Sequence, residues 1–184
     1  METAELIREA RQGSAAAQKC LFDQWCGSML TVCRRYVKNT QDAEELLLDG
    51  FYKFFKSLPS FRYQGDPALY AWLKKVMVNE CLMFLRKRNS FTMLSEPAGE
   101  EAVVAEEVLD RLSARDILGM ILQLPVGYRT VFNLFEMEGR SHREVAELLK
   151  ISEGTSRSQL SKAKALLQKM ILQNDMGYDK QQQQ

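Results

Sequence analysis

The chain has 184 residues, 46% of them hydrophobic, with 4 Pro and 10 Gly. This length suits one domain or two small ones, and the scarcity of Pro and Gly favours helices over a turn-rich β fold and excludes disorder throughout the chain. Because the formal net charge is only +1, charge becomes informative when it is counted segment by segment.

The sequence contains no targeting or metal-binding pattern. The first fourteen residues lack the apolar stretch of a signal peptide, and the longest apolar run, 117–122, is far too short to span a membrane. The four cysteines form no C-x-x-C pair, which favours buried, reduced thiols over a metal or redox site. They are Cys20, Cys26, Cys33 and Cys81. We therefore expect a cytoplasmic protein that needs no cofactor and no metal.

Three helices are predicted in the first part of the chain. The first has one buried stripe at steps of three and four residues, formed by Leu21, Trp25, Met29, Val32 and Tyr36. Thr40 is expected to cap the second helix, which ends near Leu58. A polar loop, 60–67, leads to the third helix, from about Ala68 to Arg88. These elements predict a first domain over residues 1–90.

The second of these helices has two apolar stripes. One is formed by Ala43, Leu47, Phe51, Phe54 and Leu58, and the other by Leu48, Tyr52 and Phe55. One small domain can hardly bury both, and the second stripe lies beside Asp42, Glu45 and Asp49. The pattern indicates a docking face for a protein partner with basic groups. The alternative is that this helix is central to its own domain.

The third helix and the loop before it have the charge of a nucleic-acid contact. Residues 62–88 contain six Lys or Arg and two acids, a local net charge of +4. One face of the helix combines cations with an amide at steps of four, three and four, through Lys75, Asn79, Leu82 and Arg86. The loop 61–67 mixes aromatic, amide and carboxylate groups with a glycine, as a pocket for an unstacked base would. Trp72 is interpreted as a core residue because of its helical spacing from Leu69 and Val76; the alternative is that it faces a base step.

The composition changes between the two halves of the chain. Residues 91–111 are predicted to form an acidic linker that is helical only towards its end. From Ser90 to Asp110 there are six acids and no Lys, Arg or His. The acids are Glu96, Glu100, Glu101, Glu106, Glu107 and Asp110. Such a segment can fold back over a basic surface and compete with DNA phosphate.

A second domain is predicted over residues 112–175. It begins with two helices, Leu112 to Leu122 and Val126 to Glu138, which are separated at Leu124-Pro125 and followed by Gly139 as a C-terminal cap. Residues 176–184 end in four glutamines and are predicted to form a disordered tail. The class predicted for the whole chain is all-α, with two small helical domains.

The most informative local signal follows this cap. The segment Ser141–Glu144 matches a capping box, which starts a short helix to about Leu149. A tight turn at Lys150 precedes Ser152, which can cap a longer helix to about Leu172. This spacing is typical of a helix-turn-helix motif.

The second helix of this motif has a cationic outward face. Its packed stripe is formed by Ser156, Leu160, Ala163, Leu167 and Met170, and its outward face by Arg157, Ser158, Ser161, Lys162 and Lys164. Residues 139–170 contain seven Lys or Arg and three Glu, a net charge of +4 that suits phosphate neutralisation. The alternative for this pattern alone is a solvated helical hairpin without a ligand.

The order of these motifs resembles that of extracytoplasmic-function sigma factors of the sigma-70 family. Residues 15–90 resemble region 2 through Asp42–Phe51, Phe61-Arg62, Gly65-Asp66, Ala71–Leu73, Asn79 and Arg86–Arg88. Residues 112–172 resemble region 4 through Leu124-Pro125, Tyr128-Arg129, Val131-Phe132, Glu138-Gly139, Ser141, Glu144–Ala146 and Ile151–Thr155. The joint order and spacing of these motifs carries the resemblance.

The resemblance implies binding to RNA polymerase core and to promoter DNA, and it leaves open whether an anti-sigma factor exists. The β′ clamp of the polymerase would be bound by Asp42, Glu45, Leu48, Asp49 and Tyr52, and the β flap by region 4. DNA would be bound by Gln64, Gly65, Asp66, Lys75, Asn79, Arg86, Arg88, Arg157, Ser158, Ser161 and Lys162. The loop and Asn79 would capture the melted minus-ten element, and the helix that carries Arg157 would read the minus-thirty-five element as duplex.

The chain departs from the family pattern at four positions. Leu48 stands where Gln is common and Gly50 where a small apolar residue is usual, so docking is expected to be kept with altered contacts. Lys150 stands at a turn position often held by Gly, where a left-handed backbone costs a non-Gly residue roughly 1 kcal/mol. Ser156 replaces Val or Ile on the packed face, which predicts a less firmly seated helix.

An enzyme is not expected. His142 is the single histidine, and its place in the first turn of a helix predicts a surface residue or a phosphate contact. No second His, metal cluster or nucleophile paired with a base accompanies it. The remaining alternatives to a sigma factor are a stand-alone helix-turn-helix regulator and a helical adaptor.

Overall fold

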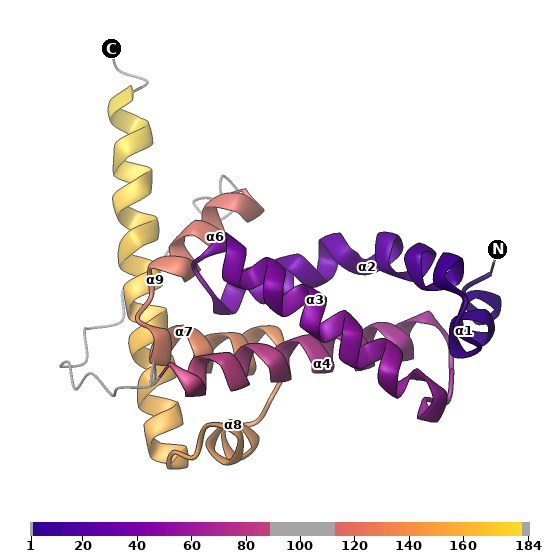
Figure 1. The fold of residues 1–184 in the computed structure, drawn as a ribbon. Coiled ribbons are helices and arrows are strands. Elements are labelled where there is room, and N and C mark those ends of the chain that lie inside the picture. The colour runs from indigo at the N-terminus through magenta and orange to yellow at the C-terminus, as the bar shows by residue number, and fades with distance from the viewer. Residues whose placement is uncertain (1, 89–112, 182–184) are drawn as a thin grey trace. The chain divides into compact units, whose positions relative to one another are not determined.

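The computed structural model describes residues 2–88 and 113–181, with side chains described up to Gln173. The chain divides into two compact units, residues 1–89 and residues 90–184. All regular structure in the described ranges is helical (Figure 1). The predicted all-α class with two small domains is therefore confirmed, whereas the acidic linker predicted at 91–111 lies outside the described residues.

The first domain is built around three long helices that pack against one another. In chain order its elements are α1 (Thr3–Arg11), α2 (Ala15–Tyr36), α3 (Thr40–Ser57), the 3₁₀ turn η1 (Leu58–Ser60) and α4 (Asp66–Lys87). The shorter α1 packs on α2 and lies close to η1 (Figure 1). The predicted stripe of α2 and the first stripe of α3 face the core, where the fully buried side chains include Leu21, Met29 and Phe54, and Leu73 of α4 joins them.

Two helix starts in the first domain differ from the prediction. The cap of α3 is Asn39, whose side-chain oxygen accepts from the amide of Asp42 at 3.0 Å, and not Thr40. Both residue types cap helices well, so two adjacent ones leave the local pattern ambiguous by one position. The helix α4 begins earlier than predicted, at Asp66, directly after Gly65 with a φ of +98°. Glycine adopts this backbone conformation readily, which lets the loop turn straight into the helix.

The four cysteines are free, but they are not all buried. Cys33 of α2 and Cys81 of α4 meet in the core, where the hydrogen bond between the two thiols, together with burial, raises the pKa of Cys81. Cys20 is exposed and Cys26 is half-buried, so the prediction of buried thiols is wrong for these two. A stripe at steps of three and four covers only one side of a helix, and both residues lie outside it.

The second domain contains the predicted helix-turn-helix. Its described elements are α6 (Ala114–Gln123), α7 (Val126–Phe132), the π-helical turn η2 (Asn133–Met137), α8 (His142–Leu149) and α9 (Glu153–Gln181). The helix α9 packs against α6, α7 and α8. It continues past the end predicted at Leu172 and into the range predicted as a tail, of which residues 182–184 lie outside the described part.

The core of the second domain forms where α7 meets α9. Its buried residues Leu124, Tyr128 and Ala163 are surrounded by Phe132, Leu166, Leu167 and Met170. Arg129 is buried beside them, and its guanidinium donates to the carbonyls of Leu124 at 2.9 Å and Leu122 at 3.4 Å. Burial lowers the pKa of Arg129, but its position at the carbonyl end of α6 is one where the helix dipole favours a cation.

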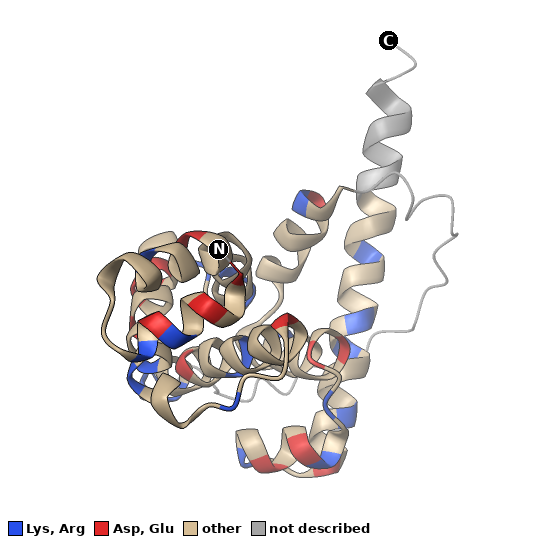
Figure 2. Cartoon of the chain, turned by 90° about the vertical axis from the view of Figure 1, so that its right-hand side faces the viewer, with Lys and Arg blue, Asp and Glu red and all other residues tan. Residues whose placement is uncertain are grey.

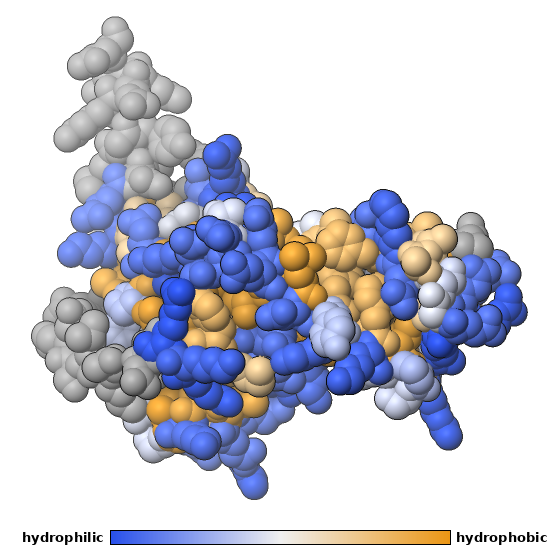
Figure 3. All heavy atoms as spheres, viewed as in Figure 1, coloured by the Kyte–Doolittle hydropathy of each residue, from blue (hydrophilic) through white to orange (hydrophobic). Residues whose placement is uncertain are grey.

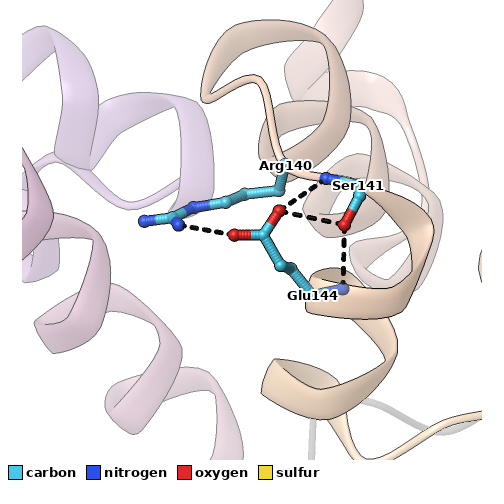
Figure 4. A network of polar contacts seen from close by, with 3 residues as sticks. All are labelled: Arg140, Ser141 and Glu144. Carbon is cyan, nitrogen blue, oxygen red and sulfur yellow. Dashed lines mark hydrogen bonds and ion pairs between the residues drawn. The ribbon is translucent and has the colours of Figure 1, made fainter.

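The capping box at the start of α8 is confirmed. The Ser141 hydroxyl accepts from the Glu144 amide at 3.3 Å, while the Glu144 carboxylate accepts from the Ser141 amide at 2.9 Å (Figure 4). Arg140 pairs with the same carboxylate at 2.9 Å. The Ser141 amide and then Arg140 lower the pKa of Glu144, so their stabilising effect is lost as the pH falls through the folded-state pKa.

The turn between α8 and α9 has the predicted left-handed residue. Lys150 adopts a φ of 57° and a ψ of 46°, and it is the single non-glycine residue with a positive φ among those that the structure describes. Ser152 then accepts from the amide of Thr155 at 3.0 Å, which confirms Ser152 as the cap of α9. The strain expected at Lys150 is therefore present.

Replacing Lys150 with Gly should stabilise the second domain by about 1 kcal/mol, because glycine has no Cβ to penalise the left-handed conformation. Lys150→Ala is the matched control, since it removes the charge but keeps a Cβ. Denaturant unfolding followed by circular dichroism measures the effect. Tryptophan fluorescence reports separately on the first domain, which contains both tryptophans. Equal stability of the two variants would contradict the assignment of strain to this residue.

Candidate functional site

The outward side of α3 places apolar and acidic side chains next to one another. Leu48 and Tyr52 are 59% and 67% exposed, and Glu45 and Asp49 are exposed within one turn of them. Phe55, predicted to belong to the same stripe, instead packs against aromatic rings of the core. The first domain thus leaves part of its second apolar stripe uncovered. Figure 3 shows hydrophobic residues that reach the surface among hydrophilic ones on this domain.

Asp42 lies in the first turn of α3, on the same side as Glu45 and Asp49, but its side chain is largely covered. Its carboxylate pairs with the guanidinium of Arg88 at 3.0 Å, and only 17% of its side chain is exposed. Arg88, which follows α4, also lies over the ring of Phe84, 4.6 Å from the centroid. The structure therefore brings together one residue predicted to bind polymerase and one predicted to bind DNA.

The loop before α4 is organised around Asp66. The Tyr63 hydroxyl donates to one oxygen of its carboxylate at 2.5 Å, and the Thr3 hydroxyl donates to the other at 3.1 Å. The hydrogen bond to Asp66 raises the pKa of Tyr63. Gln64 is exposed and Gly65 is half-buried. Asp66 thus holds the loop in shape, while Gln64 is the loop residue of the predicted site that is most open to solvent.

The exposed face of α4 carries the predicted cations and amide. Lys75, Asn79 and Arg86 are all exposed. Leu82, which the spacing placed on the same face, is 2% exposed, and Met83, at 40%, takes its position. A step of three residues from Asn79 and a step of four both continue one side of a helix, so the spacing could not separate these two residues. Met83 is therefore the residue of this face that the sequence analysis missed.

Trp72, interpreted from its spacing as a core residue, is half-buried and packs among aromatic rings. Its ring is parallel to that of Phe61, with the centroids 4.2 Å apart and the planes at 3°. The ring centroid of Phe54 on α3 lies 5.0 Å from that of Trp72, with the two planes tilted at 48°. Trp72 therefore joins α4 both to the loop and to α3.

The first turns of α9 carry the residues predicted to read bases. Arg157 and Ser158 are exposed, and the Arg157 guanidinium pairs with Glu153 at 2.9 Å. Ser161 and Lys162 are half-buried, and the Lys162 ammonium lies 6.0 Å from the centroid of an aromatic ring of α7, at the limit of a cation–π contact. Lys and Arg recur along the described part of α9 (Figure 2).

His142, predicted to be a surface residue or a phosphate contact, is half-buried and connects α8 to α9. Its Nδ1 lies 2.9 Å from the Ser156 hydroxyl, and its ring stacks on Phe135 with the centroids 4.3 Å apart. Ser156 is fully buried, so at this point α9 is held by a hydrogen bond rather than by an aliphatic side chain. The partner lies on another helix, 14 residues along the chain, where local spacing gives no signal.

The described residues offer neither a metal centre nor a membrane span. Among them, no three His, Cys, Asp or Glu side chains are arranged to hold a metal ion. None of the described helices combines the length and the apolar character that crossing a membrane requires. The sites above are therefore surfaces of helices and of one loop.

Comparison with known families identifies both domains. Residues 21–91 match the family model of Sigma-70 region 2, and residues 114–167 match that of Sigma-70, region 4. The two matches together cover more than half of the chain. The chain belongs to the sigma-70 family. As a sigma factor it binds core RNA polymerase and directs promoter-specific transcription initiation.

Its curated relatives are similar over nearly their whole length. The RNA polymerase sigma-H factor of Pseudomonas aeruginosa is 27% identical over 180 residues, which cover 91% of this chain and 92% of that protein. The ECF RNA polymerase sigma-E factor of Haemophilus influenzae is 27% identical over 179 residues, which cover 90% of this chain and 93% of that protein. This sigma factor is therefore of the extracytoplasmic-function type.

A solved structure shares the fold. The sigma factor RpoE of Bartonella quintana, crystallised with the anti-sigma factor NepR, is 22% identical with a TM-score of 0.50. The similarity covers 84% of this chain and 96% of that one. It supports the helical architecture described above.

The His142–Ser156 contact should contribute measurably to the stability of region 4. His142→Phe keeps a ring to stack on Phe135 but removes the hydrogen bond, and we expect the free energy of unfolding to fall by about 1 kcal/mol. Adding Ser156→Ala should cause little further loss, because the bond is already absent. Denaturant unfolding of the four variants of this cycle is the measurement, and independent, additive losses would contradict the coupling.

Proposed function

We propose that this sigma factor divides promoter recognition between α4, which holds single-stranded bases of the minus-ten element, and α9, which reads the minus-thirty-five element as duplex. The observation that carries the proposal is the exposed row Lys75, Asn79 and Arg86 on α4, the helix that begins directly after the loop ending in Gly65. Two separate basic helices on two domains suit two contacts with one promoter.

The α4 surface has the groups that an unstacked base requires. Asn79 offers an amide that can both donate and accept, and Lys75 lies one turn before it as a partner for phosphate. Gln64 supplies a second exposed amide from the loop, and the thioether of Met83 adds an apolar surface for a base face. These groups bind bases that have left the stack, which favours the melted state of the DNA.

The α9 surface has the groups that read duplex DNA. Arg157 can contact a guanine edge through two hydrogen bonds, and its pairing with Glu153 orients the guanidinium outward from the first turn of the helix. Ser158 is exposed beside it, and Ser161 and Lys162 continue the same side towards the middle of α9. Helix-turn-helix proteins place this part of their second helix in the major groove.

The polymerase would bind the outward side of α3. Leu48 and Tyr52 provide apolar surface of the kind that dominates binding energy at interfaces, and Glu45 and Asp49 surround them with negative charge. The β′ clamp is the polymerase element that the family resemblance assigns to this face, and the β flap is the element it assigns to region 4.

This sigma factor would act by binding alone, in the cytoplasm where polymerase works, and without a catalytic step. An anti-sigma factor is a further partner that we propose, because the sigma factor RpoE of the same fold is bound to one. A regulator that covered Leu48 and Tyr52 would exclude the polymerase from α3. Run-off transcription with core polymerase tests the whole assignment, since a stand-alone regulator would not direct initiation.

Asn79→Ala should impair promoter melting more than initial promoter binding, because the amide is proposed to contact bases only after they leave the duplex. Permanganate footprinting of the minus-ten element measures melting, and a filter-binding titration measures closed-complex affinity. Gln24→Ala, at an exposed position of α2, is the control. Equal melting by Asn79→Ala and wild type would remove Asn79 from this role.

Arg157→Ala should lose roughly 1 to 3 kcal/mol of binding on the preferred upstream element and should discriminate less at one base pair, as expected for a bidentate contact to a base. Lys169→Ala, an exposed cation further along α9, should weaken binding to all sequences alike. Binding titrations on a panel of upstream elements separate the two outcomes. A uniform loss for Arg157→Ala would make it a phosphate contact.

A further inference from the structure

We infer that α1 is a positioning element for the capture loop, residues 61–66, and that Arg11 is its principal positioning residue. The inference rests on the proposed role of this loop in holding melted DNA. The helix α1 (Thr3–Arg11) lies outside the residues matched by either family model, which begin at residue 21. Its contacts with the loop are nevertheless specific, and they come from both of its ends.

The C-terminal end of α1 holds the start of the loop. The Arg11 side chain donates from Nε to the carbonyl of Leu58 at 3.2 Å and from Nη2 to the carbonyl of Phe61. The Leu58 carbonyl already accepts from the Phe61 amide across the 3₁₀ turn η1, so Arg11 adds a second donor there and also holds the carbonyl of Phe61, the residue that follows the turn. One planar guanidinium therefore fixes the chain direction from the end of α3 into the loop.

The N-terminal end of α1 holds the other end of the loop. Thr3, the first residue of α1, donates to the Asp66 carboxylate at 3.1 Å, and Tyr63 donates to the second oxygen of that group. Asp66 is the first residue of α4. A helix of this length spans about 14 Å. Its two ends therefore contact the two ends of the loop, Arg11 at the start and Thr3 at the end.

The helix α1 can hold the loop in place because it is itself anchored in the core. Leu6, Ile7 and Ala10 are buried, at 6%, 1% and 4% exposed. Within the loop, the exposed residues are Arg62 and Gln64, which are the side chains left to meet DNA. The loop is therefore ordered when the protein folds, and its conformational entropy is not lost a second time when a base is captured.

Arg11→Ala tests the inference, with Arg8→Ala as the matched control. Arg8 is on the same helix, 67% exposed, and pairs with Glu5 at 3.1 Å on the surface. Arg11→Ala should lower the melted fraction of promoter by roughly tenfold, the effect of losing one net hydrogen bond to a charged donor. Binding to core polymerase and to a duplex minus-thirty-five element should be unchanged. Melting equal to that of Arg8→Ala would overturn the inference.

A double-mutant cycle with Gln64→Ala shows whether Arg11 acts through the loop. If it does, Arg11→Ala should have a much smaller effect on promoter melting when Gln64 is already Ala. The side chain that the loop would present to the DNA is then absent, so the position of the loop matters less. Full additivity of the two changes would overturn the positioning role.

Hydrogen exchange of the loop amides separates this inference from the proposed function. In the free protein, Arg11→Ala should raise exchange at residues 61–65 at least severalfold, and Arg8→Ala should not, because order in the loop does not depend on DNA. Unchanged exchange would show that Arg11 does not order the loop and would overturn the inference. Raised exchange together with normal melting by both Gln64→Ala and Asn79→Ala would instead show that the proposed function of the loop is wrong, and with it the part of the inference that concerns DNA.

Discussion

The aromatic contacts of Trp72 with Phe61 and Phe54 are the constraint that links α4, the loop before it and α3 in region 2. Trp72 belongs to α4, Phe61 to the capture loop and Phe54 to α3, and the ring centroids are 4.2 Å and 5.0 Å from that of Trp72. Aromatic side chains bury a large area with few rotatable bonds, so they fix relative positions at a low entropic cost. The surfaces proposed to bind DNA and polymerase, on α4 and α3, are thereby packed against each other within one domain.

Region 4 combines its apolar core with polar groups that join its helices. Arg129 binds carbonyls at the end of α6, and His142 binds Ser156 between α8 and α9. Buried polar groups of this kind specify geometry, because each has few alternative partners and leaving one unpaired costs more than the bond contributes. If Arg157 and Ser158 read DNA as proposed, directional contacts that fix the register of α9 are more useful than additional aliphatic packing.

Features encoded within a few residues could be predicted from the sequence, whereas contacts between distant segments could not. The capping box at Ser141, the left-handed Lys150 and the cap at Ser152 are local, and each was found. Local signals fail where neighbouring residues satisfy the same rule, as with Asn39 and Thr40. The contacts of Arg11 and Thr3 with the loop join residues 47 to 63 positions apart, and no periodicity reports such a pairing.

The ion pair of Asp42 and Arg88 joins the start of α3 to the end of α4, the two helices whose exposed faces are proposed to bind polymerase and DNA. Its atoms are 3.0 Å apart, but 60% of the Arg88 side chain is exposed. An exposed pair of this kind contributes at most about 1 kcal/mol, because water and salt screen it and because the long arginine side chain loses freedom. The pair is therefore too weak to hold either residue back from a phosphate or from a basic group of the polymerase. Because the Asp42 side chain is largely covered, Glu45, Leu48, Asp49 and Tyr52 present most of the outward surface of α3.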